Sequence, residues 1–332
     1  MRACSGWTRP QAGSAIVIWQ ARRWVRRHPS FAPRKRSSAG AASHMSQALD
    51  HRTHAFRPDL ADARLQGLVA AKKFIKPTLQ RCTLGRVPVY GQPDLSGPMI
   101  SEVRFGEMVD VFDVVDNIAW VQNRADDYVG YTFADAYGQE LCNPQHRVGV
   151  LRTFLFSAPR LKSQPIDMLT LGTLVEVMGA PEDGFVPINP HGWIYEKHLM
   201  PTDVYYHPVE TALRLLGVPY LWGGRSPVGC DCSGLVQLCL ELAGVQAPRD
   251  SDQQRHALAT DVIIDWESLP LERGDIIFMD GHVGLMASAF ELVHANAHHM
   301  QVTVEPLADA VVQAGPLVAW ASAKDFMQAV AA

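Results

Sequence analysis

The sequence predicts an α+β fold in which one helix packs on an antiparallel sheet, preceded by two small all-β barrels. Three observations predict this arrangement. A Gly-rich loop at residues 219–234 leads into an apolar run at 235–242 that is typical of a buried helix. Strand-like apolar segments with a Gly turn follow at 274–286 and 291–296. Upstream, residues 89–111 align without gaps with residues 155–177, at an offset of 66, which indicates a duplicated all-β unit.

The first 44 residues differ in composition from the rest of the chain. They carry nine Lys or Arg and no Asp or Glu, so the remaining residues have a net charge of about −13. One interpretation is translated upstream sequence with Met45 as the physiological start, which gives a cytoplasmic protein. The other is a leader, because Arg-rich, Ser-rich, acid-free segments resemble targeting peptides, and the protein would then be exported. We favour the start at Met45.

Composition excludes several classes of protein. The chain has 332 residues with 47% hydrophobic content, enough for two or three folded domains. The longest apolar run near the start, Ala15 to Trp19, is far shorter than the roughly 20 residues of a transmembrane helix. The acidic remainder argues against nucleic-acid binding, which needs a basic face. The sequence has no coiled-coil heptad, and we expect a monomer.

The six cysteines are irregularly spaced and predict no disulfide framework. Cys230 and Cys232 form a C-x-C pair, which has too few neighbouring ligands for zinc, and we expect no metal or organic cofactor. For Cys82 and Cys239 we expect small core residues rather than nucleophiles.

Before the α+β domain the chain divides into three segments. Residues 45–78 predict a helix with Leu65, Leu68 and Val69 as its apolar stripe. Residues 79–144 and 145–203 predict the two barrels, from period-2 alternation and from G-Y and G-W turns. The gapless alignment pairs Gly106 with Gly172, and after a short deletion Gly130-Tyr131 corresponds to Gly192-Trp193.

The α+β domain, residues 204–332, contains a candidate nucleophile. Cys232 lies where the predicted helix begins, and unpaired N–H groups and the helix dipole there favour a thiolate. His282 begins one predicted strand and His294 lies in the next, so a hairpin would bring both imidazoles to one face of the sheet. We expect Cys232 to attack, His282 to transfer the proton and His294 to orient His282, with Asn296 as the alternative third residue.

This constellation resembles the NlpC/p60 family of bacterial cell-wall cysteine peptidases. The family's motifs occur here in the same order over residues 204–325: Tyr220 with Trp222-Gly223-Gly224, Asp231-Cys232-Ser233-Gly234, Pro248-Arg249-Asp250-Ser251 with Gln254, Gly274-Asp275, and His282-Val283-Gly284. The resemblance implies a papain-like α+β fold and cleavage of murein stem peptides between γ-linked D-glutamate and the following diamino acid. Both meso-diaminopimelate and lysine fit that position.

The same resemblance implies a substrate pocket. The motif residues that would line it are Tyr220, Asp231, Ser233, Arg249, Asp250 and Ser251. Tyr220 would also help the backbone N–H of Cys232 hold the oxyanion. Structural roles compete with this interpretation, because Asp231 and Ser233 can cap the helix and Arg249 can be an ion-pair partner.

The two barrels resemble bacterial SH3-like domains, which often accompany such catalytic domains. Glu107 of the first copy aligns with Thr173 of the second, and only the first has the run Asp126-Asp127-Tyr128. We therefore expect Glu107 and Tyr128 to receive the free amine of an L-Ala-γ-D-Glu stem, although a solvated acid and a core tyrosine are the plain alternatives. The protein would then release L-Ala-D-Glu from free peptides during wall recycling.

Three other functions compete with this one. The first is an exported endopeptidase that cuts intact wall and uses the barrels as anchors. The second is a non-catalytic wall-binding scaffold, which the complete Cys232, His282 and His294 set disfavours. The third is an amidase or acyltransferase on the same papain-like core.

Overall fold

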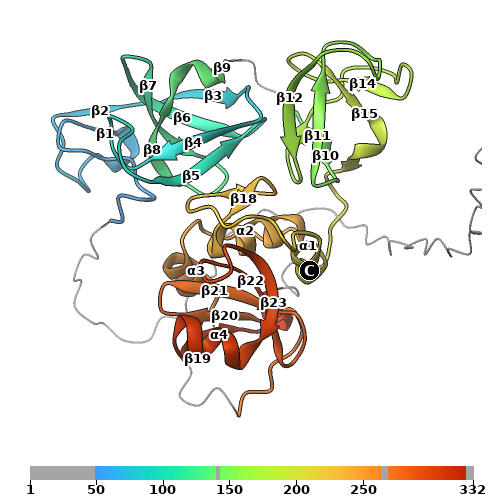
Figure 1. The fold of residues 1–332 in the computed structure, drawn as a ribbon. Coiled ribbons are helices and arrows are strands. Elements are labelled where there is room, and N and C mark those ends of the chain that lie inside the picture. Colours follow the sequence, from blue (N-terminus) through green and yellow to red (C-terminus); the bar gives the residue numbers. More distant parts are fainter. Residues whose placement is uncertain (1–48, 140–142, 260, 263–267, 327–332) are drawn as a thin grey trace, which may run out of the picture.

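The computed structural model describes residues 49–139, 143–259, 261–262 and 268–326, so the predictions for residues 1–44 lie outside the described residues. Two all-β units lie side by side, and a third unit with helices α1 to α4 packs beneath them (Figure 1). Among the described residues, no helix is long and apolar enough to cross a membrane.

Barrel 1 is built on one seven-stranded sheet with the order β5-β4-β8-β7-β6-β3-β9. Its strands are β3 (Thr78–Cys82), β4 (Arg86–Tyr90), β5 (Met99–Arg104), β6 (Met108–Val115), β7 (Ile118–Asn123), β8 (Val129–Phe133) and β9 (Tyr137–Gly138), with the 3-10 turn η2 (Ala134–Ala136) before β9. Valines on alternate positions, such as Val87, Val89 and Val103, fill its interior together with Cys82.

Barrel 2 keeps the same strand order but divides it between two sheets, β12-β11-β15-β14 and β13-β10-β16. Its strands are β10 (His146–Val148), β11 (Arg152–Phe156), β12 (Pro165–Thr170), β13 (Leu174–Val175), β14 (Phe185–Pro187), β15 (Trp193–Tyr195) and β16 (Leu199–Pro201), with the 3-10 turn η3 (Glu196–His198) before β16. The sheet divides where β13 has only two residues, whereas its counterpart β6 has eight.

The predicted duplication is confirmed by strand register. Arg86 pairs with Arg104 in barrel 1, and Arg152 pairs with Thr170 in barrel 2 at the same offset of 66. The register shift after Val89 recurs after Leu155. Beyond the deletion, Tyr131 pairs with Tyr90 as Trp193 pairs with Phe156. The two barrels therefore share a fold down to the position of one irregularity.

The helix predicted over residues 45–78 is wrong for the part that the structure describes. Residues 49–78 form the parallel strands β1 (Leu60–Asp62) and β2 (Lys73–Ile75) and the 3-10 turn η1 (Ala63–Leu65). The predicted stripe is not a buried face, since Leu68 is 69% exposed. Gly67, at φ +85°, adopts a left-handed conformation that ends helical structure at this point.

The third unit is an antiparallel sheet covered by helices. The sheet has the order β19-β24-β20-β21-β22-β23. Its strands are β19 (Asp261–Val262), β20 (Ile276–Met279), β21 (His282–Met286), β22 (Glu291–Asn296), β23 (Gln301–Pro306) and β24 (Leu317–Ala321), and a short hairpin of β17 (Arg225–Ser226) and β18 (Gly229–Cys230) precedes the central helix. The helices are α1 (Pro208–Arg214), α2 (Cys232–Leu242), α3 (Ser251–Leu258) and α4 (Leu307–Ala314).

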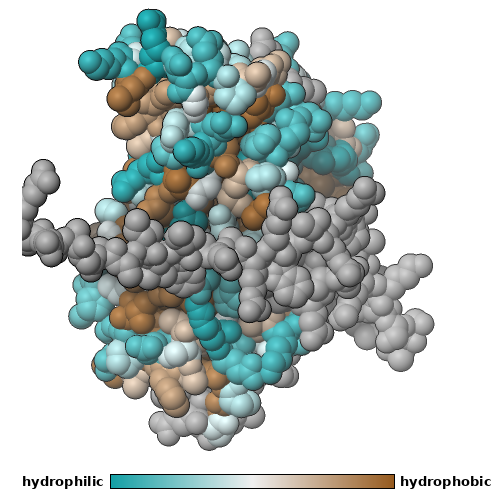
Figure 2. All heavy atoms as spheres, turned by 90° about the vertical axis from the view of Figure 1, so that its right-hand side faces the viewer, coloured by the Kyte–Doolittle hydropathy of each residue, from teal (hydrophilic) through white to brown (hydrophobic). Residues whose placement is uncertain are grey.

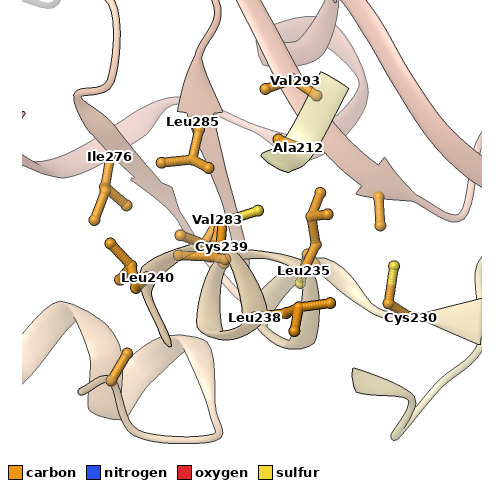
Figure 3. Close-up of a cluster of buried hydrophobic side chains, with 14 of the residues drawn as sticks. Ala212, Cys230, Leu235, Leu238, Cys239, Leu240, Ile276, Val283, Leu285 and Val293 are labelled. Atoms are coloured by element: carbon orange, nitrogen blue, oxygen red, sulfur yellow. The ribbon is translucent and has the colours of Figure 1, made fainter. Parts of the chain in front are cut away.

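Helix α2 is the centre of this unit. All its residues except Glu241 are buried, which is the pattern of a helix covered on every side. Figure 3 shows its apolar side chains facing those of the sheet strands, among them Val283, Leu285 and Val293. Cys239 lies fully buried in this cluster, as expected for a core residue.

One side chain from each barrel enters the core of the next unit. Phe105, which follows β5, packs with Val148, Leu155 and Ile194 in the core of barrel 2. Leu171, which follows β12, belongs to the core around α2. On the side of the molecule seen in Figure 2, hydrophilic and hydrophobic residues are interspersed over the coloured surface.

Candidate active site

Cys232 is the first residue of α2, as the sequence predicts. The Asp231 side chain caps the helix by accepting the Gly234 N–H at 2.8 Å. Gly234 is required there, because a Cβ atom would lie 2.1 Å from the Gly224 carbonyl oxygen. The two Gly-rich motifs therefore pack on each other and fix the start of the helix.

The environment of Cys232 favours the neutral thiol over the expected thiolate. The residue is only 7% exposed, and burial, with a further contribution from the Asp231 carboxylate, raises the pKa of the thiol to about 12. Hydrogen bonds from the Val283 and Ser233 backbone N–H groups lower this pKa but do not offset burial. In the free protein, desolvation thus outweighs the helix dipole, and a base must take the proton during attack.

The two histidines lie together on the neighbouring hairpin. Strands β21 and β22 pair antiparallel, and His282 Nε2 lies 2.8 Å from His294 Nδ1. The hydrogen bond from Val283 places the Cys232 sulfur next to the residue that follows His282. The structure therefore brings Cys232, His282 and His294 together in the order expected of nucleophile, base and orienting group.

Burial lowers the pKa of His282 to about 4, and His294 lowers it further while Glu305 opposes the shift. His282 is therefore neutral at pH 7 and can accept a proton. Together with the raised pKa of Cys232, this gives a neutral thiol–imidazole pair that becomes charged as the nucleophile attacks.

A carboxylate that the sequence interpretation missed lies behind the histidines. Glu305 Oε1 on β23 is 2.6 Å from His294 Nε2. Asn296, the alternative third residue, lies beside His294 and not beside His282: its Nδ2 is 2.8 Å from His294 Nε2. The only signal for Glu305 in the sequence is the alternation of Thr303 and Glu305 on one strand, which places both on the face that carries His294.

Arg249, Asp231 and Ser233 form one buried network. Arg249 Nη2 donates to Asp231 Oδ2 at 2.6 Å, and Nη1 donates to Ser233 Oγ at 2.9 Å. Asp231 Oδ2 also accepts the Gly223 N–H at 2.8 Å. These contacts match the capping and ion-pair alternatives, so the three residues hold the loops around Cys232.

The other predicted pocket residues lie around this network. Tyr220 is half-buried, and burial first, then the nearby Cys232 and Asp231, raises the pKa of its hydroxyl. Ser251 is the first residue of α3 and is half-buried, and Asp250 directly precedes it. Tyr220 thus lies near the nucleophile, while Asp250 and Ser251 lie at the start of the next helix.

Barrel 1 and the segment that precedes it form a wall beside Asp250. The Tyr128 hydroxyl donates to Asp250 Oδ2 at 3.0 Å, and Arg52 Nη1 donates to the same oxygen at 2.9 Å. The Asp250 side chain remains 24% exposed, so a further partner can reach it. Tyr128 therefore lies at the contact between barrel 1 and the catalytic unit.

Glu107, which we expected to receive a free amine, has partners within the protein. Its side chain is 6% exposed, and its oxygens accept hydrogen bonds from Arg104, Arg225 and Asn123. Burial opposes ionisation, but Arg225 and Arg104 hold the pKa of Glu107 down to about 2. Such a carboxylate is already neutralised by two guanidinium groups.

Glu107 instead borders a cavity of about 310 Å³ where the three units meet. Thr173 of barrel 2 and Gln237 and Glu241 of α2 also line this cavity, and neither Cys232 nor the two histidines does. In the part of the chain that the structure describes, no three His, Cys, Asp or Glu side chains cluster as metal ligands would.

Comparison with known proteins gives the same picture. Residues 217–320 match the NlpC/P60 family, and residues 89–133 match the bacterial dipeptidyl-peptidase SH3 domain. The chain is 26% identical over 246 residues to dipeptidyl-peptidase 6 of Lysinibacillus sphaericus, covering 66% of this chain and 88% of that protein. It is 25% identical over 240 residues to the gamma-D-glutamyl-L-lysine dipeptidyl-peptidase of Bacillus subtilis, covering 64% and 77%.

A solved structure has the same fold over most of its length. The crystal structure of an NlpC/P60 family protein from Bacillus cereus superposes with a TM-score of 0.62 at 17% identity, covering 74% of this chain and 99% of that one. At that identity the match shows the fold alone. The family matches and the Cys232, His282 and His294 geometry together show a cysteine peptidase in which residues 217–320 form an NlpC/P60 domain and residues 89–133 match a bacterial dipeptidyl-peptidase SH3 domain.

Proposed function

We propose that this cell-wall peptidase hydrolyses the γ-D-glutamyl–diamino acid bond of murein stem peptides. The substrate is a free peptide with an unblocked N-terminal L-Ala, and the product is L-Ala-D-Glu. The names of the relatives from Lysinibacillus sphaericus and Bacillus subtilis support a dipeptidyl-peptidase. The observation that carries the proposal is the hydrogen bond from Tyr128 of barrel 1 to Asp250 of the catalytic unit.

The wall formed by barrel 1 supports a preference for small free peptides. Asp250 is a partly exposed carboxylate with a phenol and a guanidinium on one oxygen. An ammonium group placed there would gain charge-assisted hydrogen bonds, which are stronger than neutral ones. Because the Glu107 carboxylate is bound by Arg104 and Arg225, we assign the free amine of L-Ala to Asp250 and Tyr128. An N-acylated stem attached to glycan lacks that charge and adds bulk against the barrel.

The reaction is a covalent acyl transfer. The Cys232 sulfur attacks the γ-carbonyl carbon while its proton passes to His282. This attack forms the S–C bond and turns the carbonyl oxygen into an oxyanion. The Cys232 N–H and Tyr220 hold that oxyanion. His282 then donates its proton to the departing diamino-acid amine as the C–N bond breaks. A water molecule, deprotonated by the same imidazole, attacks the thioester and releases L-Ala-D-Glu and the thiol.

The first test compares free L-Ala-γ-D-Glu-diaminopimelate, its N-acetylated form and intact sacculi, with products identified by mass spectrometry. We expect L-Ala-D-Glu from the free peptide alone. Cys232→Ala should remove turnover while peptide binding, measured by calorimetry, is retained. Equal rates on the free and N-acetylated peptides would overturn the assignment of the amine. Cleavage of sacculi would instead support the alternative of an endopeptidase acting on intact wall.

A second test isolates the wall of barrel 1. Tyr128→Phe removes the hydroxyl that holds Asp250, so kcat/KM for the free peptide should fall about 10- to 150-fold, the size of one hydrogen bond to a charged group. The rate for the N-acetylated peptide should stay the same. Tyr137→Phe is the matched control, because that hydroxyl lies within barrel 1, 3.5 Å from Thr132 Oγ1. An equal loss in both variants would contradict the proposal.

A further inference from the structure

We propose that Glu305 is a positioning residue for catalysis, which extends the Cys232, His282 and His294 set to a relay of four and fixes the tautomers of both imidazoles. The inference rests on the cysteine peptidase chemistry and holds whichever murein peptide is cut. It adds a role for a side chain outside the family motifs that the sequence displays.

The geometry places Glu305 at the end of a continuous chain of hydrogen bonds. His282 Nε2 lies 2.8 Å from His294 Nδ1, and His294 Nε2 lies 2.6 Å from Glu305 Oε1. His294 is 1% exposed and the Glu305 side chain is 10% exposed, so these contacts are largely sheltered from water. Pairing of β22 with β23 sets the two residues on adjacent strands.

The carboxylate decides which nitrogen carries each proton. An ionised carboxylate only accepts hydrogen bonds, so His294 Nε2 must carry a proton toward Glu305. His294 Nδ1 is then unprotonated and accepts from His282 Nε2–H. The remaining nitrogen of His282, Nδ1, keeps its lone pair and is free to take the proton of the Cys232 thiol.

The Asn296 amide favours the opposite tautomer of His294, so the Glu305 charge is needed to set the tautomer described above. Its Oδ1 accepts the His299 N–H at 2.7 Å, and its Nδ2 donates to Thr303 Oγ1 at 3.1 Å, so the orientation of its amide is set by neighbours. Nδ2 therefore faces His294 Nε2, where an N–H group favours the opposite tautomer. Without the Glu305 charge, Asn296 would promote a proton on His282 Nδ1, which blocks its action as a base.

The surroundings of Glu305 keep it ionised. Burial acts to raise its pKa, but hydrogen bonds from Gln313 on α4 and from His299 and His294 hold the pKa below its usual value. Gln313 and His299 bind the outer oxygen, Oε2, at 3.0 and 3.1 Å. The inner oxygen is left for His294. The same charge stabilises the imidazolium that forms when His282 takes the thiol proton.

The test is Glu305→Gln in the full chain, with Gln313→Ala as the matched control. The amide introduced by Glu305→Gln keeps the shape of the side chain but lacks its charge. We expect kcat to fall about 10- to 100-fold with KM unchanged, which is the size of the loss when the carboxylate behind a metal-ligating histidine is changed. Gln313→Ala removes only a contact to the outer oxygen and should retain most of the activity. An unchanged melting temperature in both variants excludes misfolding as the cause.

Two further readouts separate positioning from a merely structural effect. Glu305 raises the pKa of His282, so its loss should move the acid limb of the kcat/KM profile to lower pH. Nitrogen-15 NMR should show a proton on His282 Nε2 in the parent and a shift toward Nδ1 in Glu305→Gln. A substrate-independent assay is the rate at which iodoacetamide alkylates the Cys232-containing peptide, which should fall about tenfold or more in Glu305→Gln.

The outcomes distinguish failure of the relay from failure of the proposed function. Loss of alkylation in Glu305→Gln supports the relay even if no murein peptide is cut, in which case only the proposed function fails. Parent-like kcat, pH profile and histidine tautomers in Glu305→Gln would overturn the relay. An equal loss in Gln313→Ala with unchanged histidine tautomers and pH profile would also overturn it, because the effect would then come from disturbed packing of α4.

Discussion

Barrel 1 and barrel 2 use the same loop to join different partners. In each barrel a turn follows the second strand of an antiparallel pair, β4–β5 in barrel 1 and β11–β12 in barrel 2. The residues at the matching position after these strands, Phe105 and Leu171, pack outside their own barrels. Phe105 enters the core of barrel 2, and Leu171 enters the core of the peptidase unit around α2. The duplicated loop thus links the three units in series, with the larger side chain joining the two barrels.

The next matched pair, Glu107 and Thr173, shows what the duplication conserves and what it changes. Glu107 Oε2 accepts the Arg104 N–H at 3.1 Å, and Thr173 Oγ1 accepts the Thr170 N–H at 3.3 Å, so both side chains close the same turn. Only Glu107 also neutralises two guanidinium groups, those of Arg104 and Arg225. The difference between the copies therefore includes a charged contact between barrel 1 and the catalytic unit.

The largest expected effect comes from giving barrel 1 the residue of barrel 2. Glu107→Thr keeps the turn but removes one of the two carboxylates that pair with Arg104, leaving Glu241, and leaves Arg225 with only longer carboxylate contacts of 3.8 Å to Asp126 and Glu241. Removal of one partner from a buried ion pair costs about 3 to 5 kcal/mol of unfolding free energy. Urea unfolding followed by tryptophan fluorescence should show that loss. If Glu107 instead bound substrate, kcat/KM for the free peptide would fall while stability stayed the same.

Truncating Phe105 or Leu171, the two side chains that enter the core of the next unit, should lower the unfolding free energy by a similar or slightly smaller amount. Phe105→Ala is expected to cost about 3 to 5 kcal/mol and Leu171→Ala about 2 to 5, since each leaves a cavity in a core. Their consequences should differ in place. Hydrogen exchange should increase in barrel 2 for Phe105→Ala and around α2 for Leu171→Ala. The same exchange pattern in both variants would contradict a serial linkage.

Lowering the pH should remove the contribution that the Glu107 carboxylate makes to the unfolding free energy. Glu107 has a folded pKa of about 2 against an ordinary value of 4.5. Its contribution to stability is therefore complete above pH 4.5 and is lost as the pH falls toward 2. Between these values the parent should lose more stability than Glu107→Thr, because the variant has no carboxylate to protonate. Parallel pH–stability curves for the two proteins would show that Glu107 is not the responsible group.

The sequence predicts the features that rest on local patterns. The gapless repeat predicts two barrels with one register, and Gly-rich motifs and strand spacing bring Cys232, His282 and His294 together. The failures depend on tertiary contacts. The apolar spacing of Leu65, Leu68 and Val69 indicates a helix only if a core is available to cover it. Burial, which a motif does not display, reverses the expected ionisation of Cys232. Arginines from two units neutralise the Glu107 carboxylate, and no motif places them next to it.

The smallest expected effect is that of Thr173→Val, and it tests whether the two turns are equivalent in their neutral part. Valine has nearly the shape of threonine but cannot accept the Thr170 N–H, and Thr173 is 1% exposed. Loss of one such hydrogen bond costs about 1 kcal/mol, well below the expected effect of Glu107→Thr. Urea unfolding under the same conditions gives the comparison. Because no charge is left unpaired, the loss of unfolding free energy should be the same at pH 5 and at pH 3. A loss as large as that of Glu107→Thr would mean that both residues stabilise the protein by closing the turn, and that neutralising the arginines adds little.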